Sequence, residues 1–160
     1  MKTLLSFIIL CTLASCQSTA QNEKKQDNFK ITKTDTEWKA ELDPMEYQVL
    51  RKAATERPFS SELLNIKEEG TFVCAACGNP LYETKHKFES GSGWPSFDRA
   101  IEGSLAYSSD RKLGYTRDEL LCGKCGGHLG HIFNDGPRET TGKRHCINGV
   151  ALDFKPKNKK

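Results

Sequence analysis

Two cysteine knuckles organise this sequence, Cys74-Ala75-Ala76-Cys77-Gly78 and Cys122-Gly123-Lys124-Cys125-Gly126. In each knuckle the two intervening residues let both thiolates face one ion, and the glycine that follows permits a tight turn. Two knuckles together supply the four sulfurs of a closed tetrahedral site. We therefore expect Cys74, Cys77, Cys122 and Cys125 to hold one structural zinc ion per chain.

The same spacing has two other interpretations, namely two disulfides or two redox-active cysteine pairs. An oxidising compartment would favour both of them. A redox-active pair normally opens a helix, whereas Gly78 and Gly126 follow these pairs within turn-rich sequence. Zinc is therefore the preferred interpretation, and the two disulfide-based forms stay as alternatives.

Short apolar stretches surround the knuckles and alternate with Gly, Pro, Asn and Asp. This spacing is typical of short antiparallel strands joined by turns. The strands are expected within residues 71–73, 81–82, 106–107, 119–121, 130–133 and 149–154. We predict a mostly β domain, with a few helices before its first strand.

The expected helices carry recognisable start signals. Asp43 can cap a helix whose first position is Pro44, and this helix should end near Ala54. Ser60 or Ser61 can begin a second short helix or turn. The N-terminal part of the domain is therefore expected to be helical, ahead of the strands.

Length and composition indicate a single domain with accessory segments. The chain has 160 residues, of which 36% are hydrophobic and 28% charged, enough to bury a modest core. A formal net charge of +3 is small for a nucleic-acid-binding protein, so no nucleic-acid partner is expected. Residues 157–160 are expected to form a basic, solvated tail.

The first 16 residues have the features of an export signal. Lys2 is followed by an apolar stretch that is too short to cross a bilayer as a stable helix. Leu13-Ala14-Ser15-Cys16 resembles a bacterial lipobox, in which the cysteine is acylated and becomes the new N-terminus. We expect a periplasm-facing lipoprotein of the bacterial cell envelope, bound to the membrane only through lipid on Cys16. A plain cleaved signal without lipid is the alternative.

The segment after the signal is polar. Residues 17–35 cannot bury much apolar surface, so they are expected to form a flexible tether. The folded domain is expected at residues 36–156, beginning near Thr36 to Trp38.

One cysteine stands apart from the others. Of seven cysteines, Cys11 and Cys16 lie in the export signal and four lie in the knuckles, which leaves Cys146. In an extended strand, residues two apart share a face, so Arg144 can favour the Cys146 thiolate and Asn148 can hydrogen-bond a reacting group. A buried, inert thiol is the alternative.

Three further segments complete a recognisable pattern. They are Gly91-Ser92-Gly93-Trp94-Pro95-Ser96-Phe97, Gly127-His128-Leu129-Gly130-His131-Ile132-Phe133-Asn134-Asp135-Gly136-Pro137 and Gly142-Lys143-Arg144-His145-Cys146-Ile147-Asn148-Gly149. Together with both knuckles, and in this order, they resemble the methionine sulfoxide reductase B family over about Trp38 to Phe154.

This resemblance implies an enzyme that reduces the R epimer of methionine sulfoxide, mainly in peptides and proteins. It also implies a mostly β fold of two antiparallel sheets, with a few short N-terminal helices and a four-cysteine zinc site distant from the active site. The residue types suit this chemistry, because sulfoxide sulfur is a poor electrophile until its oxygen is protonated. The reaction needs a thiolate, an acid near the oxygen and an apolar seat for the methyl group.

The resemblance also implies roles for single residues. Cys146 is the expected nucleophile and becomes a sulfenic acid as methionine leaves. His128 and His131 match active-site histidines that can donate a proton to the sulfoxide oxygen. A second metal site formed by His128, His131 and Cys146 is the alternative.

Three more residues match the family around this site. Trp94 matches the residue whose ring receives the substrate methyl group, with a core tryptophan as the alternative. Asp135 matches a carboxylate that orients the second histidine, with a turn-forming role as the alternative. Phe133 is expected to complete the apolar wall, unless it belongs to the core.

The sequence departs from the family at three places. Ser92 stands where many members have a resolving cysteine, so an external thiol donor, expected to be thioredoxin-like, must reduce Cys146. His145 replaces a more usual Tyr or Phe and should face away from Cys146 by strand alternation. Gly149-Val150 replaces a common Ser-Ala pair.

Two other functions compete with the reductase. A noncatalytic zinc-ribbon module explains the knuckles but leaves the Trp, His, Arg, Cys and Asn constellation without a role. A dithiol-disulfide oxidoreductase needs metal-free C-x-x-C pairs. We expect an enzyme that acts as a monomer on oxidised peptides or proteins.

Overall fold

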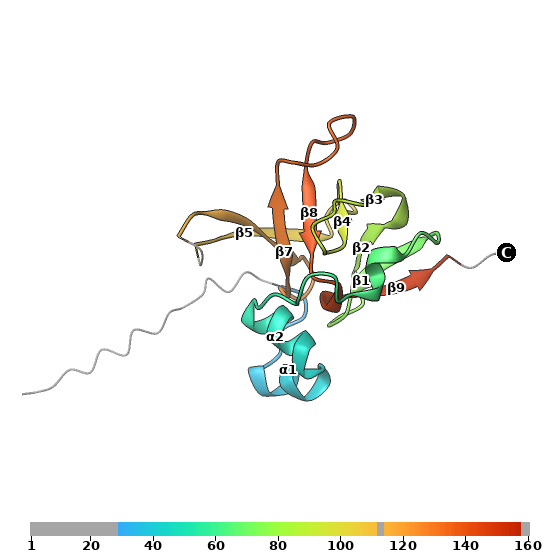
Figure 1. Cartoon of the computed structure of the whole chain (residues 1–160). Coiled ribbons are helices and arrows are strands. Elements are labelled where there is room, and N and C mark those ends of the chain that lie inside the picture. The colour runs from blue at the N-terminus through green and yellow to red at the C-terminus, as the bar shows by residue number, and fades with distance from the viewer. Residues whose placement is uncertain (1–28, 112–113, 158–160) are drawn as a thin grey trace, which may run out of the picture.

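The computed structural model describes residues 29–111 and 114–157 (Figure 1). The predicted signal at 1–16 lies outside the described residues. So do residues 17–28 of the predicted tether and residues 158–160 of the predicted tail.

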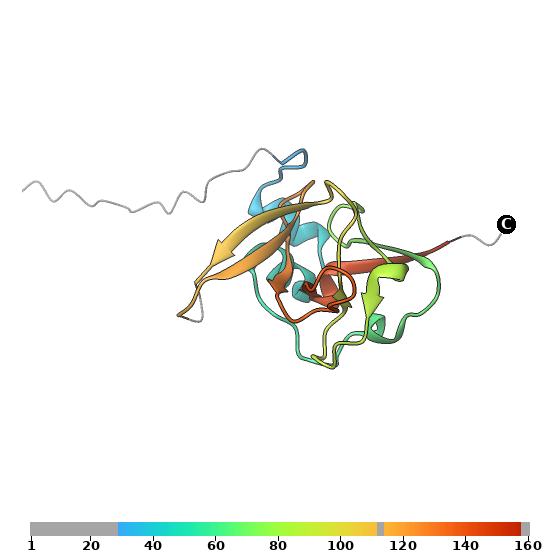
Figure 2. The ribbon, with the colours of Figure 1, turned by 90° about the horizontal axis from the view of Figure 1, so that it is seen from above.

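Two antiparallel sheets form the domain, as the sequence predicts. The smaller sheet has the order β2 (Pro80–Glu83), β1 (Gly70–Cys74), β9 (Leu152–Pro156). The larger sheet has the order β3 (Lys87–Phe88), β4 (Ser96–Phe97), β8 (Arg144–Ile147), β7 (His128–Phe133), β6 (Arg117–Cys122), β5 (Leu105–Asp110). Figure 2 shows the β5–β6 hairpin projecting from the body of the domain.

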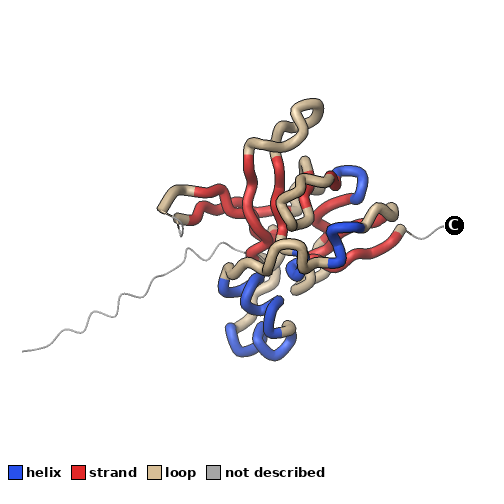
Figure 3. The backbone as a smooth tube through the Cα atoms, viewed as in Figure 1, coloured by secondary structure: helices blue, strands red, loops and turns tan. Residues whose placement is uncertain are grey.

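Two helices precede the sheets and lie together at one end of the domain (Figure 3). Helix α1 (Asp35–Glu41) is capped by Thr34, whose hydroxyl accepts from the Glu37 N–H. Helix α2 (Pro44–Lys52) begins where the sequence predicts and ends just before the predicted Ala54. It ends there because Ala53 adopts a left-handed conformation with φ of 52°.

Three short 3₁₀ turns complete the helical segments. They are η1 (Glu62–Asn65), η2 (Thr84–His86) and η3 (Gly149–Ala151). Ser61 caps η1 by accepting from the Leu63 N–H at 3.2 Å, which confirms the predicted short helix or turn. None of the helices in the described ranges has the length and hydrophobicity that a bilayer crossing requires.

Aromatic side chains join the two sheets into one core. The Tyr82 ring of β2 stacks on the Phe97 ring of β4 with centroids 4.2 Å apart. The Phe72 ring of β1 meets the Phe97 ring edge-on at 5.0 Å. Helix α2 packs against β7 and buries Val49 and Leu50, so the core supports the strand that carries both histidines.

The prediction for the last strand is corrected. Residues 149–154 were expected to form one strand, but residues 149–151 form η3 and β9 begins at Leu152. The reason is that the N–H groups of Gly149 and Val150 bind the Glu56 carboxylate instead of a neighbouring strand.

The predicted tether is also shorter than expected at its C-terminal end. The Ile31 N–H binds the Lys124 carbonyl in the second knuckle at 3.0 Å, and Asp35 already belongs to α1. The described domain therefore includes residues 29–35, because this segment gains backbone hydrogen bonds and a helix cap.

Candidate active site and metal centre

The register of the larger sheet places Cys146 in a row of functional side chains. Cys146 on β8 lies opposite Ser96 on β4 and opposite His131 on β7. His131 in turn lies opposite Glu119 on β6. Directly opposed residues point to the same face of a sheet, so these four side chains share one face across four strands.

A β-bulge brings His128 to the same face. Residues three apart on a regular strand point to opposite faces. Between β6 and β7, however, Leu120 pairs with Gly130 while Leu121 pairs with His128, so one extra residue of β7 is accommodated. The His128 and His131 rings therefore meet edge-on, with centroids 5.3 Å apart.

Each histidine is held by a carboxylate that the sequence interpretation missed. Glu119 Oε1 lies 2.7 Å from His128 Nδ1, and Asp110 Oδ2 binds His131 Nε2. The hydrogen bond from His128 lowers the pKa of Glu119, whereas burial lowers the pKa of His131. Both acids lie in the β5–β6 hairpin, and only the strand pairing brings them to the histidines.

Asp135 binds Arg144, which corrects its predicted role. The Arg144 guanidinium donates from Nε and Nη2 to the two Asp135 oxygens, both at 2.9 Å. The guanidinium carbon also lies 4.5 Å from the centre of the Phe133 ring, its direct cross-strand partner. Asp135 follows the end of β7, where antiparallel pairing places it near the start of β8 and away from His131.

The Cys146 thiol is half-buried between Arg144 and Ser92. Its Sγ lies 3.9 Å from the Ser92 hydroxyl oxygen. Burial raises the pKa of Cys146, while Ser92 and Arg144 act in the opposite direction. Arg144 therefore favours the thiolate as expected, but the effect of burial exceeds its contribution.

We expect Arg144→Met to move the pH midpoint for alkylation of Cys146 further upward, because the variant loses a charge that lowers the thiol pKa. Iodoacetamide labelling across a pH series, followed by peptide mapping of Cys146, measures this midpoint. Lys143→Met removes an exposed neighbouring charge and serves as the control. A midpoint that is unchanged or lower in Arg144→Met contradicts the assignment.

Trp94 and Asn148 are both attached to Glu56, a residue that the sequence interpretation missed. Half-buried Trp94 donates from Nε1 to the Glu56 carbonyl at 3.3 Å. The Glu56 N–H donates to Asn148 Oδ1 at 3.0 Å, and Asn148 Nδ2 donates to the Leu129 carbonyl at 3.0 Å. Asn148 was expected on the face of Cys146, but β8 ends at Ile147 and these bonds to the backbone hold its buried side chain.

His145 faces away from Cys146, as strand alternation predicts. It is buried, and its Nδ1 lies 3.2 Å from the Tyr82 hydroxyl. Burial lowers the pKa of His145 to about 4. His145 therefore packs as a neutral ring in the core between the two sheets.

The four knuckle cysteines form a separate cluster. Their sulfurs all lie within 4.8 Å of one another, with Cys74–Cys125 at 3.8 Å and Cys77–Cys122 at 3.6 Å. A zinc ion at about 2.3 Å from each of four sulfurs requires sulfur separations of about 3.8 Å. The four residues therefore fit a structural metal site, and none of them is disulfide-bonded.

Comparisons with known proteins show which family the chain resembles. The model of the SelR domain matches residues 42–156. Peptide methionine sulfoxide reductase MsrB of Leptospira interrogans is 49% identical over 128 residues, covering 79% of this chain and 97% of that protein. The MsrB of Bradyrhizobium diazoefficiens is 50% identical over 134 residues, covering 83% and 96%.

An archaeal relative and one solved structure extend the comparison. The MsrB of Methanosarcina barkeri is 49% identical over 126 residues, covering 78% of this chain and 88% of that protein. The crystal structure of the Mis18 'Yippee-like' domain has a TM-score of 0.46 and 16% identity over 57% of this chain and 100% of that one, too weak a likeness to support an argument. From its domain match and these relatives, the chain belongs to the SelR domain family, that of the B-type peptide methionine sulfoxide reductases.

Proposed function

We propose that the chain reduces the R epimer of methionine sulfoxide in peptides and proteins through a sulfenic acid on Cys146. The observation that carries this proposal is the direct opposition of Cys146 and His131 on one sheet face, with Arg144 beside the thiol. A nucleophilic sulfur, a cation and the histidine pair His128 and His131 thus lie together, apart from the four clustered cysteines.

The reaction balances with these groups. The Cys146 thiolate supplies an electron pair, the sulfur–oxygen bond of the substrate breaks, and a sulfur–oxygen bond forms on Cys146. One proton from a histidine ends on the oxygen, and the proton lost by the thiol replaces it. The products are methionine and the Cys146 sulfenic acid. Trp94 and Phe133 are the apolar side chains that would seat the substrate methyl group.

An assay of both sulfoxide epimers tests this proposal. With a dithiol as reductant, the chain is expected to reduce a peptide that contains the R epimer and to leave the S epimer unchanged. The measurement is the amount of methionine formed, by chromatography, from each pure epimer. Equal reduction of both epimers, or reduction of neither, would refute the proposed specificity.

Ser92 supports a cycle that depends on an external thiol donor of the thioredoxin type. The serine hydroxyl lies next to Cys146 but cannot form a disulfide with it. Two electrons from a donor dithiol then reduce the sulfenic acid, which releases water and leaves a disulfide on the donor.

We expect Ser92→Cys to form an intramolecular disulfide with Cys146 after one turnover without reductant. The present oxygen–sulfur distance of 3.9 Å requires only a small movement to reach a disulfide bond of about 2 Å. Non-reducing peptide mapping measures the product. The parent chain should give a sulfenic acid that dimedone traps, and an internal Cys146 disulfide in the parent would contradict the external-donor cycle.

We propose zinc as the metal of the four-cysteine cluster, with a structural role. Four thiolates in a closed set suit zinc, and they leave no open position for substrate. The metal would join β1 to the end of β6 through the two knuckles.

The proposal also includes an envelope location. The apolar residues that precede Cys16 support export and lipidation of a periplasm-facing domain. The predicted mature N-terminus is a lipid-modified Cys16, followed by the polar residues from Gln17 onward. Mass spectrometry of the mature chain tests this assignment, and an unmodified N-terminus beyond Cys16 would exclude the anchor.

A further inference from the structure

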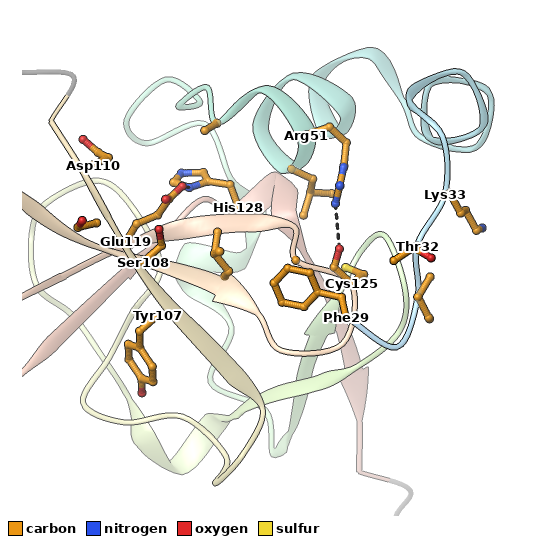
Figure 4. A pocket seen from close by; sticks show the side chains of 16 residues that line it. Phe29, Thr32, Lys33, Arg51, Tyr107, Ser108, Asp110, Glu119, Cys125 and His128 are labelled. Carbon is orange, nitrogen blue, oxygen red and sulfur yellow. Dashed lines mark hydrogen bonds and ion pairs between the residues drawn. The ribbon is translucent and has the colours of Figure 1, made fainter. Parts of the chain in front are cut away.

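The two candidate active-site histidines are bound by carboxylates that differ in their other partners. Glu119 binds His128 at Nδ1, at 2.7 Å. Asp110 binds His131 at Nε2 and also accepts from Arg117 Nη2 at 3.0 and 3.1 Å, so its charge is shared. Figure 4 shows Glu119 reaching toward His128 at one end of a cavity of about 930 Å³.

The Nε2 atom of His128 is buried and has no hydrogen-bond partner among the described residues. The residue as a whole is 4% exposed. Its other nitrogen, Nδ1, is bound to Glu119. A buried polar atom without a partner is unfavourable, so a ligand atom that bonds it gains more than it would at an exposed site.

We propose that Glu119 is a positioning residue that binds Nδ1 of His128, so that Nε2–H donates to the sulfoxide oxygen and His128, not His131, is the proton donor. This inference rests on the proposed reductase function. The proton passes from Nε2 to the oxygen while the Cys146 electron pair reduces the substrate sulfur. The proton released by the Cys146 thiol restores the proton on Nε2 of His128.

The charges around the pair favour this division of roles. The Glu119 carboxylate lies 2.7 Å from Nδ1 of His128, which fixes the orientation of this ring. At His131, burial lowers the pKa, and Arg117 adds to this effect against Asp110.

Other charged side chains near the two histidines already have partners of their own. From α2, Arg51 lines the same cavity, but its guanidinium donates to the Cys125 carbonyl. From the N-terminal segment, Lys33 lines the cavity and pairs with Glu41. Neither of these cations therefore competes with His128 for the Glu119 carboxylate.

Three variants of the β5–β6 hairpin test the inference in the full-length chain. Glu119→Gln should lower kcat by about 30-fold with little change in KM, because the His128 ring loses the carboxylate that orients it. Asp110→Asn should lower kcat by less than Glu119→Gln does. Asp118→Asn removes an exposed charge next to Glu119 and should match the parent.

Two results would overturn the inference. One is a larger kcat loss in Asp110→Asn than in Glu119→Gln. The other is a kcat of Glu119→Gln that equals the kcat of Asp118→Asn. If Glu119→Gln does not fold, Glu119→Asp replaces it, with a smaller kcat loss expected.

Nitrogen-15 NMR of the histidine rings gives a readout that does not need substrate. In the parent chain, the His128 Nδ1 proton should be protected and coupled across the bond to Glu119, and Glu119→Gln should lose this protection. An unprotected Nδ1 in the parent would refute the positioning role. A parent that shows this protection but reduces neither epimer would refute the proposed function and leave the placement of Glu119 standing.

Discussion

Cys146→Ser is expected to abolish sulfoxide reduction, with kcat falling by more than about 10³-fold while the fold and metal content stay unchanged. The reason is that the hydroxyl of serine is far less nucleophilic than a thiolate, and it cannot cycle through a sulfenic acid. Loss of a nucleophile in an enzyme commonly costs this much or more. The measurement is single-turnover reduction of the R epimer with excess enzyme.

The design of this experiment separates chemistry from folding. Serine and cysteine have nearly the same size, and Cys146 lies outside the metal cluster, so metal stoichiometry and melting temperature should match the parent. His145→Phe provides a matched neighbour on the opposite face of β8, where an aromatic ring packs against Tyr82. Activity of Cys146→Ser within about tenfold of the parent would exclude Cys146 as the nucleophile.

Removal of the metal is expected to lower the melting temperature by at least about 10 °C, which is the second large effect. Binding of structural zinc contributes on the order of 10 kcal/mol in small domains, and losing even part of this shifts the transition by several degrees per kcal/mol. The cluster links strands from both sheets, so its loss should loosen the whole domain. The measurement is calorimetry after chelation, with metal content by mass spectrometry.

Cys125→Ser tests the same site without a chelator. Its thiol is buried and lies 3.8 Å from the Cys74 sulfur, so the variant should bind less metal and melt at lower temperature than the parent. Cys146→Ser is the control, because it removes one thiol from outside the cluster. A parent protein that contains no metal and two intramolecular disulfides would contradict the metal assignment.

Local sequence was sufficient for the elements whose signals lie within a few residues. The start of α2 at Pro44 and the cap of η1 at Ser61 were predictable from capping chemistry. The gathering of the four knuckle sulfurs followed from two C-x-x-C spacings, and the placement of His145 followed from strand alternation. The separation of Cys146 from the cluster needed only a count of the cysteines.

Only the tertiary structure decided which side chains meet across strands. The bulge that turns His128 toward His131 depends on how β6 pairs with β7, and alternation alone would have placed the two rings on opposite faces. The pairing of β5, β6 and β7 brings Glu119 and Asp110 to the histidines from another hairpin. The pairing of β7 with β8 places Asp135 next to Arg144.

The sequence by itself therefore determined the fold class, the grouping of four cysteines that fits a metal site and the separation of Cys146 from that group, because each depends on spacing along the chain. It did not determine the partners of the histidines, of Asp135 or of Asn148. Those partners depend on strand register and on the path of the chain through Glu56, which joins segments about 90 residues apart in the sequence. Register is set by the packing of the whole domain, so no local pattern could reveal it.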